Sequence, residues 1–368
     1  MRFVFGLLVL VVACGGKNGA GPDGGGGNSG GGNGGAGAAG GGGGRGGATS
    51  GTAGTGGGTS GSGGVTVDAA QDHPADASSD VPRPTPRLTW TLMTPGWDAS
   101  YISGAANGEI WIANRGGSAL QIRADGTSAA TDLQLSTSAY VTGLWVAGPN
   151  NAYVSAYANL VLHWDGSGTW KRDIMTSGTI FNSVWGSGPA DVYAVTDLGV
   201  YHSAGDDKWT LQPITETTLS GFGWLTGTGP TDLWLAGDHG EIFRSTGDAT
   251  WRRETSTDVY YVNQLWAASP SEAYFVTSLA IMHRLPSTGS WVAETPLLAG
   301  NEHINAIWGS GSNDVYAGTD QSRLFHSVGD GVWRDDGFNG NAGIHGIWGR
   351  NAGDVYLATS SGIFHGVP

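Results

Sequence analysis

The stretch SVWGSGPADVYAV, residues 183–195, places a short turn between a tryptophan and an Asp-Val-Tyr triplet, and close copies of it recur along the chain. An aromatic residue ends the triplet in each copy, and the seven aromatics are separated by 42, 40, 41, 40, 42 and 40 residues. So regular a period indicates a repeat architecture. We call these residues the register aromatics: Trp111, Tyr153, Tyr193, Trp234, Tyr274, Tyr316 and Tyr356.

Two further sets of tryptophans follow the same period. An early tryptophan stands eight residues before the register aromatic in five copies and ten before it in a sixth; a late tryptophan stands 16 or 17 residues after it. The early set is Trp145, Trp185, Trp224, Trp266, Trp308 and Trp348. The late set is Trp170, Trp209, Trp251, Trp291 and Trp333. Large apolar side chains at fixed places in most copies predict contacts between neighbouring copies.

Each repeat predicts four short strands. The first ends near the early tryptophan, the second is rich in β-branched and aromatic residues, and the fourth holds the late tryptophan. The third carries a histidine or arginine: Arg123, His163, His202, Arg244, His283, His326 or His365. No segment keeps an apolar period of about 3.6 residues. The predicted fold class is all-β, a seven-bladed β-propeller of four-stranded antiparallel blades, with tryptophans packed between the blades.

The two ends of the repeat region predict how the ring closes. The last repeat stops at Pro368 without a late tryptophan, whereas RLTWTLMT, residues 87–94, brings a spare Trp90 before the first repeat. We expect this N-terminal strand to complete the last blade, which closes the ring and leaves no open sheet edge. The propeller domain is then predicted to span residues 87–368.

WGSGPADVYAV and the following GVYHSAGDDKW resemble the repeats of β-propeller lipoproteins of Gram-negative bacteria, with the pattern W-G-x(4)-D-V-Y. More distantly, the repeats are similar to Asp-box (BNR-type) propellers, whose turn between the third and fourth strands reads S-x-D-x-G-x-T-W. The turns 203–209 and 327–333 are one residue shorter than that pattern, and their aspartate is displaced. The resemblance covers residues 87–368 and implies an architecture that serves many functions.

Residues 1–13 are predicted to be a lipoprotein signal peptide. A basic residue precedes an apolar run that is too short to span a bilayer as a helix. VVAC, residues 11–14, resembles the bacterial lipobox, which implies cleavage before Cys14 and a lipid on that residue; the alternative is ordinary secretion. Because Gly15 is not aspartate, the resemblance to lipoprotein sorting favours the outer membrane. We therefore expect a cell-envelope lipoprotein that faces the periplasm or the cell surface.

Residues 14–86 are predicted to form a disordered linker. Of the 50 residues from 15 to 64, 29 are glycine, and residues 65–86 are acidic and proline-rich. Such segments bury too little apolar surface to offset the entropy lost on ordering them. A coil of this length has a root-mean-square reach of about 45 Å. The linker would tether the propeller to a membrane through the lipid on Cys14.

The charge and cysteine content exclude several classes of protein. The net charge is −14, and the chain shows no basic stripe of the kind that nucleic-acid binding requires. A single cysteine forms neither an intramolecular disulfide nor a structural zinc site. We expect a monomer without a cofactor. Bound calcium is an alternative without sequence support, because no turn matches a complete calcium loop.

The acidic residues of the repeat are interpreted as scaffold. Each can accept backbone N–H bonds and fix its hairpin turn, whereas one site would not need a copy in every blade. The acids are Glu109, Asp191, Asp232, Glu272, Asp314 and Asp354. The alternative is a ring of carboxylates. The recurring histidines are likewise expected to bond within their own blades, the alternative being a metal site.

Candidate binding residues are sought where the repeat varies. In propellers, the connections from the fourth strand to the next first strand share one face with those from the second to the third strand. We call it the connection face, and here it carries Trp97, Asp98, Arg115, Tyr140, Tyr157, Phe181, Asp238, His239, Tyr260, Tyr261, His303 and His345. The selected candidates are Trp97, Asp98, Arg115, Tyr261, His303 and His345.

Exposed aromatics with a few polar groups suit a protein or glycan ligand. The sequence therefore predicts a non-enzymatic binding or scaffolding propeller. The alternative is a propeller-type glycosidase or lyase that acts on a polysaccharide. A glycosidase of the usual kind needs two carboxylates on one face. Resemblance to sialidases would add an arginine cluster, and the connection face supplies Arg115 without arginine partners.

Overall fold

The computed structural model describes residues 87–157, 159–174, 180–214, 221–237, 240–256 and 261–368. The predicted signal peptide 1–13, the linker 14–86 with Cys14, and the candidate residues Asp238, His239 and Tyr260 lie outside the described residues. Across the described ranges there is no helix, so none is available to span a membrane.

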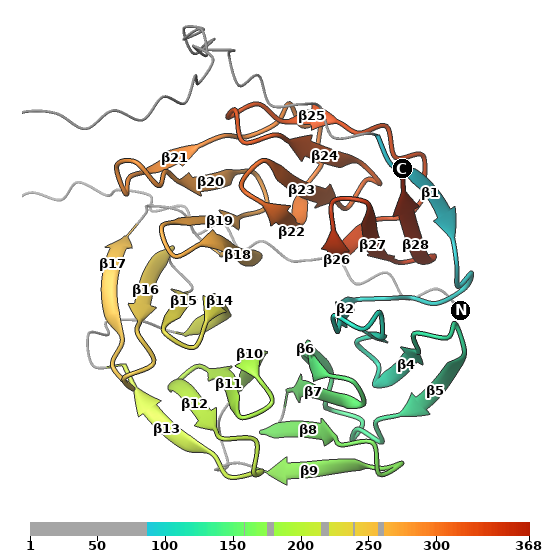
Figure 1. The fold of residues 1–368 in the computed structure, drawn as a ribbon, viewed down its shortest axis with the longest axis vertical. Coiled ribbons are helices and arrows are strands. Elements are labelled where there is room, and N and C mark those ends of the chain that lie inside the picture. The colour runs from blue at the N-terminus through green and yellow to red at the C-terminus, as the bar shows by residue number, and fades with distance from the viewer. Residues whose placement is uncertain (1–86, 158, 175–179, 215–220, 238–239, 257–260) are drawn as a thin grey trace, which may run out of the picture. The chain divides into compact units, whose positions relative to one another are not determined.

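Seven four-stranded antiparallel sheets follow one another around a central axis (Figure 1). Blade 1 has β2 (Tyr101–Gly104), β3 (Ile110–Ala113), β4 (Ser118–Ile122) and β5 (Ser128–Asp132); blade 2 has β6 (Val141–Gly148), β7 (Asn151–Ala156), β8 (Leu160–Trp164) and β9 (Trp170–Ile174). Blade 3 has β10 (Phe181–Gly188), β11 (Asp191–Thr196), β12 (Gly199–Ser203) and β13 (Thr210–Pro213); blade 4 has β14 (Phe222–Gly229), β15 (Asp232–Gly237), β16 (Glu241–Ser245) and β17 (Arg252–Ser256). Blade 5 has β18 (Gln264–Ser269), β19 (Glu272–Val276), β20 (Ile281–Arg284) and β21 (Trp291–Ala293); blade 6 has β22 (Ile304–Gly311), β23 (Asp314–Thr319), β24 (Leu324–Ser327) and β25 (Arg334–Asp335). Blade 7 has β26 (Ile344–Asn351), β27 (Asp354–Thr359), β28 (Gly362–Val367) and β1 (Thr89–Leu92).

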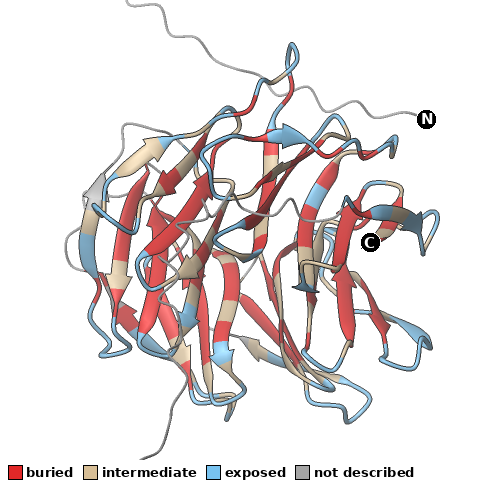
Figure 2. Cartoon of the chain, turned by 45° about the horizontal axis from the view of Figure 1, so that its top comes forward, coloured by how far each residue is buried: buried red, intermediate tan, exposed pale blue. Residues whose placement is uncertain are grey.

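The opening motif is the inner hairpin of blade 3. Trp185 on β10 pairs with Tyr193 on β11, and a two-residue turn separates Gly188 from its partner Asp191. The second strand of each blade lies between neighbouring blades, and all six residues of β23 and β27 are buried. Burial on both faces explains why these strands read as continuous apolar runs instead of alternating. Figure 2 shows exposure concentrated in the connections and outer strands.

Blade 7 closes as predicted. β1 pairs with β28 in antiparallel register from Thr89 opposite Val367 to Leu92 opposite Phe364. Trp90 packs edge-on against Phe338, with ring centroids 5.7 Å apart. The outermost strand of the last blade therefore comes from the N-terminal end of the propeller, and the prediction of ring closure is confirmed.

The early tryptophans join each blade to the next. In five of the seven seams, the indole lies over a glycine on the inner strand of the following blade, so that a Cβ there would come within 2.5–2.8 Å of the ring. The five pairs are Trp145 with Gly186, Trp185 with Gly227, Trp266 with Gly309, Trp308 with Gly349, and Trp348 with Gly104. A flat ring thus fills the space that a side chain would otherwise occupy.

In the two remaining seams, a small residue stands in place of the tryptophan and a larger residue in place of the glycine. In blade 1 the residue opposite the register aromatic is Ser103, and the next blade has Val146 where the other seams have glycine. The hydroxyl of Ser103 accepts the Val146 N–H at 3.0 Å. In blade 4 the corresponding pair is Thr226 and Ala267, because Trp224 stands two residues earlier. A small hydroxyl residue therefore replaces tryptophan wherever the facing glycine is lost.

The late tryptophans reach back to the preceding blade. Trp209 packs edge-on against Tyr153 with centroids 6.4 Å apart, and its indole N–H donates to Asp173 at 3.0 Å. Trp333 meets Tyr274, and Trp291 meets Trp234, in the same edge-to-face geometry. Such pairs contribute roughly 0.5–1.5 kcal/mol beyond their burial. The prediction that tryptophans pack between neighbouring blades is confirmed.

Candidate functional site

The recurring histidines and acids are structural parts of the blades. In five blades, the third-strand histidine lies against the register tyrosine with ring centroids 4.0–4.6 Å apart; four of these pairs are stacked, and His202 is tilted by 34° to Tyr193. Its Nε2 lies 2.6–3.1 Å from the residue that opens the second strand, which is an acid in four of these blades. The pairs are Asn151 with His163, Asp191 with His202, Glu272 with His283, Asp314 with His326, and Asp354 with His365. The expectation that these histidines bond within their blades is confirmed.

The acids hold their turns differently from the expectation. They were expected to accept backbone N–H bonds, but Asp314 accepts from the Ser310 hydroxyl at 2.6 Å and Asp232 from the Thr228 hydroxyl at 2.6 Å. Glu109 does accept a backbone N–H, from Asn150 of the next blade. The turn has only two residues and its flanks already pair in the strand ladder, so the carboxylate bonds to side chains instead.

Blade 1 corrects the third-strand assignment. Sequence spacing placed Arg123 in the set, whereas Gln121 pairs with Trp111 across the strands and donates to Glu109 at 2.9 Å. Arg123 belongs to the turn after β4. Counting residues along the sequence does not show which residues of two strands lie opposite each other. That register is set by the backbone pairing of β3 with β4.

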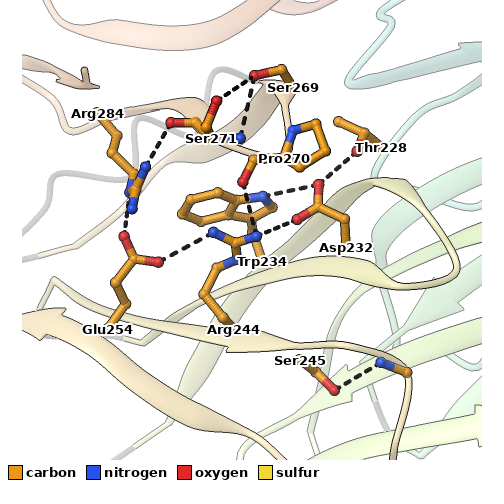
Figure 3. A network of polar contacts seen from close by, with 11 residues as sticks. Thr228, Asp232, Trp234, Arg244, Ser245, Glu254, Ser269, Pro270, Ser271 and Arg284 are labelled. Carbon is orange, nitrogen blue, oxygen red and sulfur yellow. Dashed lines mark hydrogen bonds and ion pairs between the residues drawn. The ribbon is translucent and has the colours of Figure 1, made fainter. Parts of the chain in front are cut away.

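Blade 4 has the densest charge cluster, shown in Figure 3. The guanidinium of Arg244 lies 3.6 Å above the Trp234 ring and pairs with Asp232 and Glu254. Arg284 of blade 5 pairs with Glu254 and donates to the Ser271 carbonyl at 2.6 Å. Two arginines and two carboxylates thus neutralise one another across a seam. The cluster fastens blade 4 to blade 5.

Metal ligation finds no support in the described ranges. Within them, no group of three His, Cys, Asp or Glu side chains lies close enough to hold a metal ion. Cys14 is outside these ranges.

The two kinds of connection meet on the connection face, as predicted. His303 precedes the first strand of blade 6 and Asp320 follows the second; the His303 N–H donates to Asp320 at 2.8 Å, and their side chains lie 3.0 Å apart. In blade 3, the Ile180 N–H donates to Asp197 at 3.1 Å in the same arrangement. In blade 2, Tyr157 replaces the acid and stacks on a tyrosine.

A pocket of about 350 Å³ opens on this face over blades 1 to 4. Its walls include Tyr101, Arg115, Tyr140, Asn182, Asp197 and Trp224. Arg115 lies 5.5 Å above the Tyr140 ring. Burial raises the pKa of Tyr101 above its usual value, and the Arg115 guanidinium beside the hydroxyl opposes this rise. The pocket therefore combines aromatic walls with one cation and one carboxylate.

His345 lies at the start of β26 and is exposed to the central channel. Desolvation by the surrounding inner strands lowers its pKa below the usual value; Asp98 opposes this, Arg115 adds to it and Asp320 opposes it. Asp98 and Arg115 thus lie within electrostatic reach of His345, and these are three of the six selected candidates. His303 joins the group through its bond to Asp320. The lowered pKa favours the neutral form of the His345 imidazole.

The other two candidates are placed differently. Trp97 is half-buried against the core cluster that contains Ala99 and Ile110, so it also supports the fold. Tyr261 is 69% exposed and adopts a positive φ of 61°. Among the described residues, no ring, hydrogen-bond or ion-pair contact joins Tyr261 to the group around Arg115.

The sequence did not predict the lining of the central channel. A cavity of about 290 Å³ runs between the inner strands, and six tryptophans border it: Trp145, Trp185, Trp224, Trp266, Trp308 and Trp348. They were expected only between sheets, but each also presents part of its indole to the channel. The signal is the Trp-Gly dipeptide of three copies, at Trp185, Trp308 and Trp348, because a glycine in five of the seven seams lets the neighbouring indole lie flat.

No protein-family model matches this chain, and no curated protein does. Solved β-propellers do match. YCF48 bound to D1 peptide is 12% identical with a TM-score of 0.62, over 76% of this chain and 95% of that one. A catalytically inactive virginiamycin B lyase from Staphylococcus aureus with quinupristin is 13% identical with a TM-score of 0.64, over 76% and 99%. The WD40 propeller domain of Doa1 is 10% identical with a TM-score of 0.62, over 77% and 96%. The chain has a propeller fold, and at these identities the likeness shows the fold alone.

Proposed function

We propose that this propeller is a non-enzymatic binding or scaffolding module that recognises a protein or glycan through its connection face. One observation carries the proposal: most of the exposed large apolar side chains of the described residues lie in the connections of that face. Among the described residues, six of the ten lie in its connections: Met93, Tyr140, Leu198, Tyr261, Leu279 and Leu297. One lies in a turn of the opposite face, Val332, and three in strands. This uneven distribution between the two faces favours the connection face as the interaction surface.

The charged residues support the same conclusion. The repeat acids bond to histidines, arginines and hydroxyls inside the blades, so their role is to support the blade fold. Similar propellers include YCF48, solved with a D1 peptide bound, and a lyase solved with quinupristin. This architecture therefore accommodates a bound peptide or a catalytic site, and the distribution of apolar side chains favours binding here.

The proposal also includes the site of action. A lipid on Cys14 would anchor the chain in the outer membrane, with residues 14–86 as the tether, on the periplasmic or outer side of the cell envelope. Metabolic labelling with an alkyne fatty acid tests this. Cys14→Ser should lose the label and leave the membrane fraction; a Cys14→Ser variant that stays labelled would refute the anchor.

Crosslinking of the full chain in its own envelope fraction, followed by mass spectrometry, tests the binding function. A double variant, Leu279→Ser with Leu297→Ser, removes two side chains that are 63% and 88% exposed and should lose most crosslinked partners. Val332→Ser on the opposite face, where the side chain is 50% exposed, is the matched control and should retain them. Equal crosslinking by both variants would reject the connection face.

His345 favours a second candidate, a lyase. The His345 imidazole lines the channel within electrostatic reach of Arg115, and its neutral form can take the proton from the carbon next to a carboxylate. The bond from the next carbon to the glycosidic oxygen then breaks, a C=C bond forms, and the departing oxygen takes a proton from water. Incubation with acidic polysaccharides, followed by ultraviolet detection of unsaturated sugar ends, tests this candidate. Product formation that disappears in His345→Gln would establish it over the binding function.

A further inference from the structure

Arg115 supplies a positive charge to the pocket on the connection face. It lies in the connection between β3 and β4, its side chain is exposed, and within the described ranges no carboxylate forms an ion pair with it at 4.0 Å or less. An arginine offers a planar set of donors that matches a carboxylate in two parallel bonds. The Tyr101 hydroxyl lies beside the guanidinium and takes part of that set, and the remaining N–H groups are available to a ligand.

The wall around Arg115 is fixed in place by its backbone and by stacking. The Val141 N–H donates to the Arg115 carbonyl at 3.0 Å, and the Tyr157 N–H donates to the Tyr140 carbonyl at 2.8 Å. The rings of Tyr140 and Tyr157 stack at 4.9 Å with an interplanar angle of 9°. This wall is therefore formed before any ligand arrives, which reduces the entropy lost on binding.

The opposite wall offers hydrogen-bond acceptors. Asp197 uses Oδ1 to accept the Ile180 N–H, and Asn182 uses its amide N–H to bond the Phe222 carbonyl at 2.6 Å. Among the described residues, the second carboxylate oxygen of Asp197 and the amide oxygen of Asn182 have no hydrogen bond, so both residues bring an acceptor to the pocket lining. Trp224 adds an aromatic surface between this wall and the channel.

We propose that this pocket binds a hexuronic acid unit of an acidic polysaccharide. The sugar carboxylate pairs with Arg115, its hydroxyls donate to Asp197 and Asn182, and its C–H face lies on an aromatic ring of the pocket. A peptide carboxylate could also pair with Arg115, but a uronate carries its carboxylate and several hydroxyl donors on one rigid ring, which suits a cation on one wall and acceptors on the other. The inference rests on the proposed binding function and narrows its ligand class.

The charge of the chain makes Arg115 decisive. With a net charge of −14, the chain as a whole repels a polyanion, so attraction must come from a local cation. Replacing Arg115 by glutamine keeps hydrogen-bonding capacity and removes the charge. Arg123→Gln is the matched control, because Arg123 is an exposed arginine in the turn between β4 and β5, near the same blade's other end.

The experiment is calorimetric titration of the full chain with short oligomers of glucuronate, galacturonate and mannuronate, each compared with its methyl ester. We expect at least one acid to bind, its ester to bind at least about tenfold more weakly, and Arg115→Gln to show the same loss while Arg123→Gln does not. A glutamate-rich peptide is a parallel probe. Thermal melting of every variant shows whether it is folded.

Three results would overturn the proposal: no uronate binds, the ester binds as well as the acid, or folded Arg115→Gln binds as the parent does. Binding of the glutamate-rich peptide alone would assign the pocket to a polypeptide and reject the sugar class. None of these results bears on the crosslinking of Leu279→Ser with Leu297→Ser. Failure of the ligand assignment is therefore distinct from failure of the binding function.

Discussion

The indole of Trp348, in the last blade, lies over Gly104 of the first, and a Cβ at position 104 would come within 2.5 Å of the ring and 2.8 Å of the Glu109 carbonyl. This contact joins the two ends of the repeat. The same pairing recurs in four other seams, where the tryptophan and the glycine are about 40 residues apart. In each of these seams, the tryptophan of one blade requires a glycine in the next.

Gly104→Ala should therefore destabilise the propeller. The added methyl group meets an indole on one side and backbone on the other, and overpacking of this kind costs about 1–3 kcal/mol. Urea unfolding measures the loss. Gly148→Ala is the control, because a Cβ there meets nothing within 4 Å, and its change should stay within about 0.5 kcal/mol. Equal stability of both variants would contradict the packing.

Removal of β1 should open the ring. A chain that begins at Gly96 loses the pairing of Thr89–Leu92 with β28 and the contacts of Trp90, whereas a chain that begins at Arg87 keeps them. We expect the shorter chain to lose at least about 4 kcal/mol in the free energy of unfolding, because an edge strand and its apolar cover are exposed together. If it fails to fold, Trp90→Ala in the longer chain measures the same contact. Melting of the shorter chain at the parent temperature would refute ring closure.

His283 should make stability depend on pH. Burial lowers its pKa, but Glu272 and Glu294, at 3.0 and 2.8 Å, outweigh burial and raise the pKa to about 9. Because the folded protein holds this proton more tightly than the unfolded chain does, protonation of His283 stabilises the fold. The stabilisation is complete at pH values below the unfolded pKa near 6.5, and it is lost as the pH rises through about 9.

His283→Gln should therefore cost roughly 2–3 kcal/mol at pH 6 and much less above pH 9, as measured by urea unfolding across that range. Glutamine is a suitable replacement, because Gln121 occupies the same place in blade 1. His303→Gln removes a half-exposed pair and should change stability by less than about 1 kcal/mol. A cost for His283→Gln that does not vary with pH would argue against the charged histidine.

The indole hydrogen bond of Trp209 should be separable from its packing. Trp209→Phe removes the donor to Asp173, whereas Trp291→Phe removes an indole N–H without a described partner. We expect Trp209→Phe to cost about 1–3 kcal/mol more than Trp291→Phe in urea unfolding. Burial raises the pKa of Asp173 and the Trp209 bond opposes the rise, so carbon-detected NMR should show a further rise in Trp209→Phe. An unchanged Asp173 titration would rule out the bond.

The repeat period predicted the blade number, the strand order and the closing strand. These follow from local patterns: two apolar strands around a short turn, copied about every 41 residues. Residue counting misassigned Arg123 in place of Gln121, because strand register is set by pairing and not by spacing. The exchange of Ser103 with Val146 also needed the structure, because it joins residues of two blades.

The candidate site was predictable only in part. Variation on the connection face selected Arg115, and Tyr140 belonged to the same face. Asn182 and Asp197 come from blade 3, and Trp224 from blade 4, so no sequence window holds the pocket. Trp97 was selected as exposed but packs on the core, because it stands where the chain turns from the closing strand into blade 1.

The position of β1 has a mechanical consequence. The chain before Arg87 joins the propeller at its outermost strand, so tension between a membrane anchor and a ligand on the connection face would pass through β1. That strand has four residues, Thr89–Leu92, paired with β28. Under such a load, the four residue pairs between β1 and β28 would carry the force together. Closure of the ring and resistance to pulling thus depend on the same short ladder.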